Sequence, residues 1–318
     1  MPKVSIIIPV YGVEKYIERC ARSLFEQTLD DMEYLFIDDC TPDHSVEILN
    51  RVLKEYPLRK NQVVIHRMEK NSGQAAVRKW GMLNATGDYV IHCDSDDWVD
   101  VTMYEKMYNK AVEENADIVV CDYVVTDDNS SDTYVTACHS VKPLELLENC
   151  LFQRDPWSLC NKLFKRTAYY KVVYPSGAMG EDMATAIQLL ARCYRMVYVP
   201  EPLYHYFYNS QSITKVITME ACIKKYEQLF ENSKIVLQFM EQTGLERYMK
   251  DALVVYKHFL RTVLYPLVWK KEYYAIWNNA FPGLNRKILL SKHTPIDEKI
   301  RILLTIVHLY PSKKHRAK

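Results

Sequence analysis

Residues 4–10, Val4-Ser5-Ile6-Ile7-Ile8-Pro9-Val10, form a β-branched apolar run that a tyrosine and a glycine follow. Such a run is typical of a strand that is buried on both faces of a parallel sheet. Apolar residues then recur at helical spacing up to residue 27, and residues 34–37 predict a second strand that ends in two aspartates. Strand, helix and strand in this order predict a βαβ unit.

The same alternation continues to residue 125 and predicts an α/β fold. Strands are expected at 63–66, 89–93 and 118–125, and helices at 45–56, 74–84, 102–114, 143–151 and 180–193. The order predicts a doubly wound sheet, mostly parallel and mixed toward its end, flanked by helices. From residue 218 the pattern is helical and is broken at Gly244, Pro266, Pro282-Gly283 and Pro295.

The charge of the chain divides in the same place. The whole chain has 41 basic and 40 acidic residues, yet its charge is +10 from Lys215 onward and −9 before it. Residues 284–318 combine nine basic and two acidic residues with an apolar stripe, which suits an anionic membrane surface, with intramolecular packing as the alternative. No aromatic-basic motif supports nucleic acid as a partner.

The composition argues against several other classes of protein. Nine cysteines lack CxxC and zinc-site spacings, so we expect reduced thiols and a cytoplasmic location. No 18-residue window is apolar and uncharged, and residues 4–10 are too short for a signal peptide, so no membrane span is expected. The eight glycines form neither GxGxxG nor GxxxxGK[ST], which argues against a Rossmann turn or a P-loop.

Candidate ligand-binding residues follow three of the predicted strands. Asp94-Ser95-Asp96-Asp97 comes directly after the strand at 89–93. Ligands bind outside the carboxyl ends of the strands in an open α/β sheet. Carboxylates this close repel one another, and a divalent cation such as Mg²⁺ or Mn²⁺, bridging a diphosphate, would relieve the repulsion. The alternative is an exposed acidic turn that caps the next helix.

Two further segments are expected at the same edge of the sheet. Asp38-Asp39 closes the second strand, and Asp39 could accept a hydrogen bond from the N–H of a base, or else form an Asx turn or helix cap over residues 41–44. Residues 71–74 lead into a helix, where Gly73 can adopt a positive φ. Arg78 could approach phosphate or ribose, with a solvated arginine as the alternative.

Together these segments resemble the inverting glycosyltransferases of family 2, which have the GT-A fold. The resemblance is carried by VSIIIPVYGVEKYI, FIDDCTPDHS, NSGQAAVRKWGMLNATGDYV and HCDSDDW. It implies that Asp39 binds the base, Asp94 the ribose, and Asp96 the metal and diphosphate. It also implies that the nucleotide-sugar pocket is lined by Pro9, Tyr11, Asn71, Gly73, Arg78 and Ser95. The chain departs from the family at Cys40, Val77 and Lys79, where glycine, alanine and asparagine are frequent.

More loosely, the resemblance extends to Glu181-Asp182 and to residues 204–214. It implies that Asp182 is the general base that deprotonates the acceptor hydroxyl, with Glu181 as the second candidate. Acidic residues also favour helix N-termini, which is the structural alternative. His205 is implied as a third metal ligand or a diphosphate contact, with a packed histidine as the alternative. Trp157 and Lys162 could line the acceptor site, or be a core tryptophan and a surface lysine.

The sequence therefore predicts a GT-A catalytic domain over residues 1–215 and a basic helical region over 216–318. The expected activity is a metal-dependent, inverting transfer of a sugar from a nucleotide sugar, UDP-linked, to a hydroxyl of a surface-glycan or lipid-linked acceptor. The cofactor would be Mn²⁺ or Mg²⁺, and the basic region could hold the enzyme at the inner face of the cell membrane. The alternative is a nucleotide-sugar-binding or assembly protein of the same fold without turnover.

Overall fold

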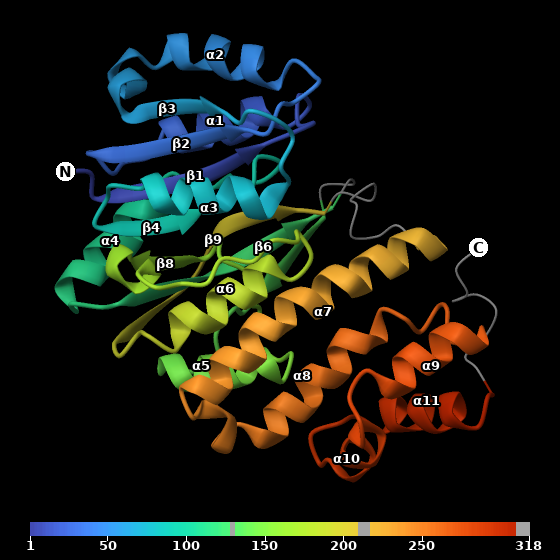
Figure 1. Cartoon of the computed structure of the whole chain (residues 1–318). Helices are drawn as coiled ribbons and strands as arrows, with labels where there is room; N and C mark the ends of the chain where they lie inside the picture. The colour runs from blue at the N-terminus through green and yellow to red at the C-terminus, as the bar shows by residue number, and fades with distance from the viewer. Residues whose placement is uncertain (128–130, 209–216, 310–318) are drawn as a thin grey trace. The chain divides into compact units, whose positions relative to one another are not determined.

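The structure, a computed structural model, describes residues 1–127, 131–208 and 217–309 (Figure 1). The chain separates into two compact units. The first comprises Met1–Leu146 and Pro156–Asn209, and the second comprises Leu147–Asp155 and Ser210–Lys318. The catalytic boundary at residues 215 and 216 stays a prediction, because compactness does not show which residues serve catalysis.

The first unit is built on one mixed sheet, whose strands run in the order β3-β2-β1-β4-β8-β6-β9-β5 in the described residues, with β7 paired to β6. Strands β3, β2, β1 and β4 are parallel, as are β6 and β9, whereas β8, β5 and β7 pair antiparallel with their neighbours. The prediction of a mostly parallel sheet that becomes mixed toward its end is confirmed. The strands are β1 (Val4–Val10), β2 (Met32–Asp38), β3 (Val63–Arg67), β4 (Tyr89–His92), β5 (Trp98–Val99), β6 (Ile118–Thr126), β7 (Asp132–Val135), β8 (Lys162–Lys165) and β9 (Met196–Phe207).

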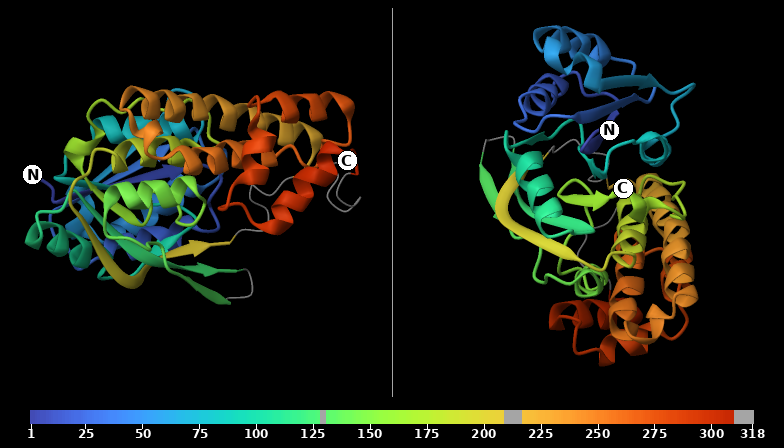
Figure 2. Two further views of the ribbon diagram at one scale, coloured as in Figure 1. Left: turned by 90° about the horizontal axis from the view of Figure 1, so that it is seen from below. Right: turned by 90° about the vertical axis from the view of Figure 1, so that its left-hand side faces the viewer.

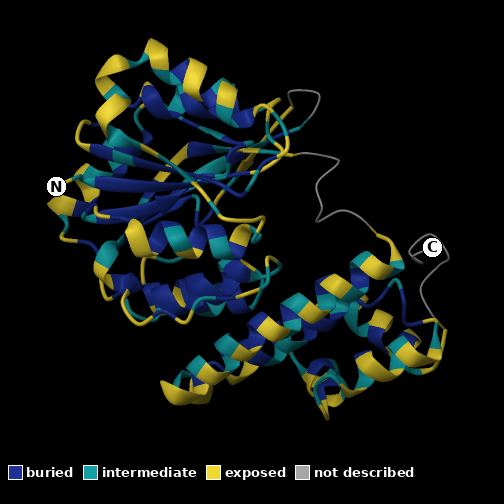
Figure 3. Ribbon diagram, turned by 45° about the horizontal axis from the view of Figure 1, so that its top comes forward, coloured by how far each residue is buried: buried dark blue, intermediate teal, exposed yellow. Residues whose placement is uncertain are grey.

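Helices cover both faces of this sheet (Figure 2). The helices that begin before residue 195 are α1 (Ile17–Phe25), α2 (Ser45–Glu55), α3 (Gln74–Asn84), α4 (Met103–Glu113), α5 (Pro143–Leu151) and α6 (Glu181–Leu190), with short 3-10 turns at Pro57–Gln62 and Arg166–Tyr169. Ile6 and Ile8 of β1 join the apolar cluster that includes buried residues of α1, α2 and α4. Ile7, on the other face of β1, lies against α3. Both faces of β1 are covered, which explains why the run at 4–10 is apolar on both faces apart from Ser5 (Figure 3).

Gly81 shows how closely α3 approaches the sheet. A Cβ atom at this position would lie 2.5 Å from Cγ2 of Ile7 and 3.3 Å from Cδ1 of Ile37. Only a glycine allows the helix backbone to come this near to β1 and β2. The close packing places the N-terminal half of α3, which carries Arg78, at the carboxyl ends of the strands.

In the second half of the sheet, the pattern predicted β6 but not β5, β7, β8 or β9. Strand β9 contains Pro200 and Pro202, which interrupt its pairing register with β6 and obscure the alternation of apolar residues. Strands β5 and β8 have two and four residues, too few for a periodic signal. Between β6 and β7, residues 128–130 lie outside the described residues.

The second unit is helical, as predicted, and α7 and α8 lie side by side in it (Figure 1). Its helices are α7 (Met219–Gln242), α8 (Lys250–Thr262), α9 (Lys271–Asn279), α10 (Leu284–Leu290) and α11 (Ile296–Ile306), with a 3-10 turn at Leu245–Arg247. Gly244 and Gly283 have φ of 73° and 74°, which explains two of the predicted breaks. In the described parts of the chain, no helix is long and apolar enough to cross a bilayer.

A polar network lies inside this helical unit. His258 on α8 contacts Oε1 of Glu298 on α11 at 2.8 Å, and the Tyr265 hydroxyl donates to the same oxygen at 2.6 Å. Burial lowers the pKa of His258, and this effect outweighs the opposing influence of Glu298. For Glu298, burial raises the pKa, but the hydrogen bonds from His258 and Tyr265 outweigh it and leave the pKa lowered.

We expect this helical unit to lose stability on acidification. Both pKa values are lower in the folded unit, so the unfolded chain binds more protons as the pH falls. The loss begins near the ordinary histidine pKa of 6.5 and continues below the glutamate value of 4.5. Each proton contributes a slope of at most about 1.4 kcal/mol per pH unit. Thermal unfolding of wild type and His258→Gln between about pH 7.5 and pH 5 should show a shallower slope in the variant. Equal slopes would contradict the assignment to His258.

Candidate active site

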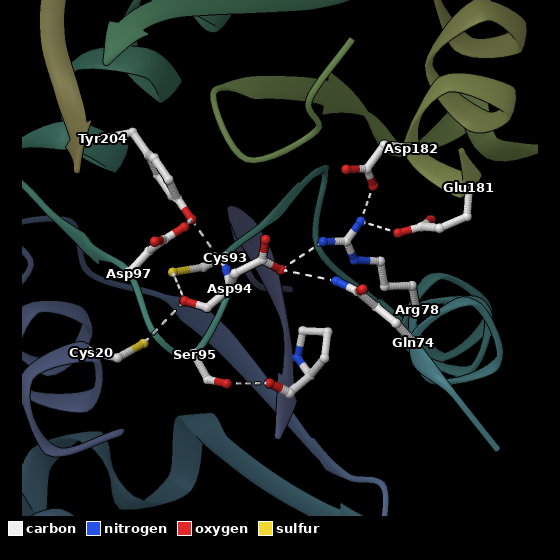
Figure 4. A network of polar contacts seen from close by, with 11 residues as sticks. Cys20, Gln74, Arg78, Cys93, Asp94, Ser95, Asp97, Glu181, Asp182 and Tyr204 are labelled. Atoms are coloured by element: carbon white, nitrogen blue, oxygen red, sulfur yellow. Dashed lines mark hydrogen bonds and ion pairs between the residues drawn. The ribbon is translucent and has the colours of Figure 1, made fainter. Parts of the chain in front are cut away.

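The loop Asp94-Ser95-Asp96-Asp97, here named the DSDD loop, is fastened to the end of β1. The backbone N–H of Cys93 donates to the carbonyl of Ile7 at 3.0 Å, and the Ser95 hydroxyl donates to the carbonyl of Pro9 at 2.6 Å. The structure thus brings together Pro9 and Ser95, both predicted to line the pocket. The bond between the Ser95 hydroxyl and the Pro9 carbonyl fixes the loop at the carboxyl edge of the sheet (Figure 4).

The three carboxylates of the DSDD loop have different surroundings. Asp94 Oδ1 accepts from Nη2 of Arg78 at 2.6 Å. Asp97 is fully buried and accepts hydrogen bonds from the Tyr204 hydroxyl and, at 2.7 Å, from the backbone N–H of Phe207. Asp96 is half-buried, and its carboxylate makes no ion pair with any described residue. An exposed acidic turn is therefore not what the structure shows. Asp100 accepts from the backbone N–H of Thr102 at 2.9 Å, and Thr102, the N-cap residue of α4, makes no side-chain cap hydrogen bond.

Asp96 is the carboxylate whose charge is least compensated. Burial raises its pKa to about 6, and the neighbouring charge of Asp94 adds to the effect. Burial raises the pKa of Asp97 as well, against its hydrogen bonds from Tyr204 and Phe207. A divalent cation fits Asp96, because hard cations prefer carboxylate oxygens and Mg²⁺ is usually held by one or two carboxylates together with phosphate oxygens. The described residues contain no ready-made group of three His, Cys, Asp or Glu ligands.

Arg78 joins the DSDD loop to the N-terminus of α6 (Figure 4). Its side chain is only 2% exposed, and its guanidinium also pairs with Glu181 and Asp182. The prediction of a solvated arginine as the alternative is therefore wrong. One guanidinium facing three carboxylates leaves the cluster negative overall. Because Arg78 pairs with both, it brings Asp94, the predicted donor-side residue, beside Asp182, the predicted general base.

Glu181 and Asp182 differ in their access to solvent. Gly180 precedes them with φ of 75°, and neither side chain caps the helix that they begin. Glu181 is 3% exposed, and burial raises its pKa although Arg78 opposes the shift. The side chain of Asp182 is 31% exposed. Of the two carboxylates, Asp182 is the one that an acceptor molecule can reach.

Asp39 organises the turn that leads into α3. Its two carboxylate oxygens accept from the backbone N–H groups of Ser72 at 2.7 Å and Gly73 at 2.8 Å. The Asx turn that was the alternative role of Asp39 is made instead by Asp38, which accepts from the Thr41 backbone N–H at 2.7 Å. Gly73 has φ of 81°, as predicted. Asn71 and Tyr11, the remaining predicted pocket residues, are both exposed.

The structure does not bring His205 to the carboxylates. In β9 it pairs with Trp98, and the two rings stack with centroids 5.0 Å apart. Burial lowers the pKa of His205. Its neighbour Tyr204 is the residue that reaches the DSDD loop, and the sequence analysis missed it. Consecutive side chains of a strand point to opposite faces of the sheet, so Tyr204 and His205 cannot both face the DSDD loop. Residues 209–214 of the predicted closing segment lie outside the described residues.

The structure also excludes one of the two roles predicted for Lys162. It is fully buried, so the surface alternative is wrong. Its ammonium donates to the carbonyls of Pro156 at 2.8 Å and Ser158 at 2.9 Å, and to Oδ1 of Asn161 at 3.1 Å. These bonds hold the loop before β8. Trp157 belongs to the same loop and is half-buried.

Known proteins resemble this chain in both sequence and fold. EpsH of Bacillus subtilis is 30% identical over 260 residues, which cover 79% of this chain and 73% of EpsH. The glycosyltransferase GlyA of Streptococcus pneumoniae is 29% identical over 231 residues, 68% of this chain but only 32% of GlyA. The crystal structure of S. aureus TarS 1–349 with UDP-GlcNAc has a TM-score of 0.72 at 17% identity, covering 96% of this chain and 88% of TarS.

A second solved structure shares the fold at lower similarity. The mannosyltransferase PcManGT from Pyrobaculum calidifontis, in complex with GDP-Man and Mn²⁺, has a TM-score of 0.55 at 14% identity, covering 97% of this chain and 86% of PcManGT. The family model of glycosyl transferase family 2 matches residues 5–174, which include β1 to β4 and the DSDD loop. The chain therefore belongs to glycosyl transferase family 2 and is a glycosyltransferase.

Proposed function

We propose that this glycosyltransferase moves a sugar from a UDP-linked donor to a hydroxyl of a surface-glycan or lipid-linked acceptor, with inversion and with a divalent metal. The observation that carries the proposal is the Arg78 cluster, in which one guanidinium holds Asp94 beside Glu181 and Asp182. Nucleotide-sugar complexes of proteins with the same fold support the donor class. UDP is favoured over GDP because TarS, which was solved with UDP-GlcNAc, is the more similar of the two.

On the donor side, we assign the base of the nucleotide to Asp39, the ribose to Asp94, and the diphosphate with its metal to Asp96. The Asp39 carboxylate is held rigidly by two backbone N–H groups, and each of its oxygens retains a lone pair for the base. A bound Mn²⁺ or Mg²⁺ would neutralise charge on the departing diphosphate. Asp96 suits this role because it is half-buried and its carboxylate forms no ion pair with a described residue, and because burial and Asp94 outweigh the weaker opposing effects of Arg19 and Arg78 on its pKa.

On the acceptor side, we assign Asp182 as the general base. In an inverting displacement the acceptor oxygen forms a bond to the anomeric carbon as the bond to the diphosphate oxygen breaks, and the base takes the acceptor proton. Arg78 pairs with the Asp182 carboxylate and orients it toward the acceptor. Glu181 is too buried to reach a substrate and serves to hold Arg78 in place.

Asp96→Asn is expected to abolish metal-stimulated sugar transfer without unfolding the protein. The change removes an uncompensated carboxylate whose pKa is already raised to about 6, so we expect the melting temperature to stay equal or to rise. The measurement is UDP release from a panel of UDP-sugars with and without Mn²⁺, together with thermal unfolding.

Asp88→Asn is the matched control for this variant. Asp88 precedes β4 at the end of the strand opposite to the DSDD loop, so the same substitution there should leave metal-dependent transfer unchanged. Full metal-stimulated activity in Asp96→Asn would contradict the role of Asp96. If the wild-type protein binds nucleotide sugars but turns none over, the alternative of a binding or assembly protein is favoured instead.

Asp182→Asn and Glu181→Gln should affect the reaction differently. We expect Asp182→Asn to lower kcat by roughly 10²- to 10⁴-fold with little change in the KM for the donor, because only the proton acceptor is lost. Glu181→Gln should chiefly lower thermal stability, since it weakens a buried partner of Arg78. Steady-state kinetics and thermal unfolding of both variants provide the comparison. A larger loss of kcat in Glu181→Gln than in Asp182→Asn would reverse the assignment of the base.

The C-terminal helix α11 offers a surface for an anionic membrane. Exposed apolar side chains recur at helical spacing along α11 and its C-cap residue. They are Ile296, Ile300, Leu303, Leu304 and Val307, and the basic Arg301 lies among them in the sequence. The sequence beyond the described residues adds Lys313, Lys314 and Arg316. An apolar face with nearby basic residues is typical of helices that lie in the lipid headgroup region. We propose that this face binds anionic lipid, where a lipid-linked acceptor would be found.

Vesicle sedimentation can test the lipid surface with substitutions that spare the core. We expect the full chain to sediment with phosphatidylglycerol vesicles, and the triple variant Ile296→Gln, Ile300→Gln, Leu303→Gln to lose most of that binding, since about 0.8 kcal/mol is lost for each CH₂ group no longer inserted. The control carries glutamine at three exposed apolar positions elsewhere, Leu58, Leu83 and Val112. Equal sedimentation of both triple variants would remove the membrane role from α11.

A further inference from the structure

Asp97 is a buried carboxylate that neither the donor nor the metal can use. Its side chain is fully buried, and both of its oxygens accept hydrogen bonds from β9, Oδ2 from the Tyr204 hydroxyl and Oδ1 from the backbone N–H of Phe207. It makes no ion pair with a residue that the structure describes. Buried charges require such partners, so this carboxylate fixes the position of the DSDD loop relative to β9.

Tyr204 makes a second contact with the same loop. Its hydroxyl accepts from the backbone N–H of Asp94 at 3.2 Å. A phenolic hydroxyl has one proton, and Asp97 receives it, so the direction of the chain is Asp94 N–H to Tyr204 to Asp97. One side chain from β9 thereby holds both the first and the last residue of the DSDD loop (Figure 4).

The ring that carries this hydroxyl is held firmly. Tyr204 is fully buried, and β9 pairs it with Val99 of β5 and with Tyr123 of β6. On its other side the loop is held by the bond from Ser95 to the carbonyl of Pro9. The loop is therefore fastened to β1 and to β9, and Asp94 and Asp96 belong to the segment that these attachments hold.

We propose that Tyr204 is a positioning residue for donor binding. Its hydroxyl sets the backbone at Asp94 and the side chain of Asp97, and so aims Asp94 and Asp96 at the ribose and at the metal-bound diphosphate. The inference rests on the proposed function for the identity of the ligand. The hydrogen bonds that carry it lie within the protein itself.

Tyr204→Phe removes the hydroxyl and keeps the packing of the ring. We expect faster amide hydrogen exchange over residues 93–99 in the free protein, because Asp94 loses its acceptor and Asp97 one of its donors. We also expect the affinity for UDP in the presence of Mn²⁺, measured by titration calorimetry, to fall by roughly tenfold, as is usual when a hydrogen bond to a buried charge is lost. In turnover, the KM for the donor should rise more than kcat falls.

Tyr104→Phe is the matched control. Tyr104 is also fully buried, but its hydroxyl has no hydrogen-bond partner in the described structure, so its removal should change neither exchange over 93–99 nor UDP affinity. Adding Asp97→Asn to Tyr204→Phe should weaken UDP binding by less than the product of the two single effects, since both changes break the same contact.

Wild-type exchange over residues 93–99 and wild-type UDP affinity in Tyr204→Phe would overturn the inference. So would equal losses in Tyr104→Phe and Tyr204→Phe, because they would show a general effect of core packing. If the wild-type protein itself fails to bind UDP with Mn²⁺, the proposed donor is wrong. Exchange over 93–99 in the two variants then decides whether Tyr204 holds the loop.

Discussion

The buried guanidinium of Arg78 pairs with the buried Glu181 and with the partly exposed Asp94 and Asp182, and the rest of the site depends on these ion pairs. Taking such charges out of water costs several kcal/mol per ion, so the cluster is stable only when each charge keeps its partners. The partners come from three places in the chain, α3, the DSDD loop and the start of α6. Their positions are therefore correlated, and the spacing between donor-side and acceptor-side carboxylates is fixed within this unit.

The DSDD loop shows how burial gives chemically similar groups different roles. Both carboxylate oxygens of Asp97 accept hydrogen bonds from β9 that hold the loop. Asp94 is paired with Arg78. Asp96 forms no ion pair with a described residue, and burial together with Asp94 raises its pKa against the weaker effects of its own backbone N–H, Arg19 and Arg78. Of the three, it is the carboxylate that gains most from a cation, which is why we assign the metal to it.

The sequence was most informative where chemistry and strand order agree. Strands β1 to β4 are regular parallel strands, so the carboxyl-end rule was enough to place Asp39 and Asp94 at one edge. Arg78 and Glu181 are 103 positions apart, and no periodicity predicts that pair. The resemblance implied a metal or diphosphate contact for His205 and gave no role to Tyr204. The choice between the two depended on the register of β9, which its two prolines conceal.

The charges of the site also bear on why a cation would be needed at all. Arg78 provides one positive charge against three carboxylates in its cluster, and Asp96 adds a further negative group nearby. A nucleotide diphosphate is itself an anion, so such a site would repel the proposed donor in the partly desolvated interior, where charges interact more strongly than in water. A divalent cation at Asp96 would reduce both repulsions. The acidity of this cluster would then be compatible with an anionic donor, so the proposed metal binding and the proposed donor binding are expected to favour each other.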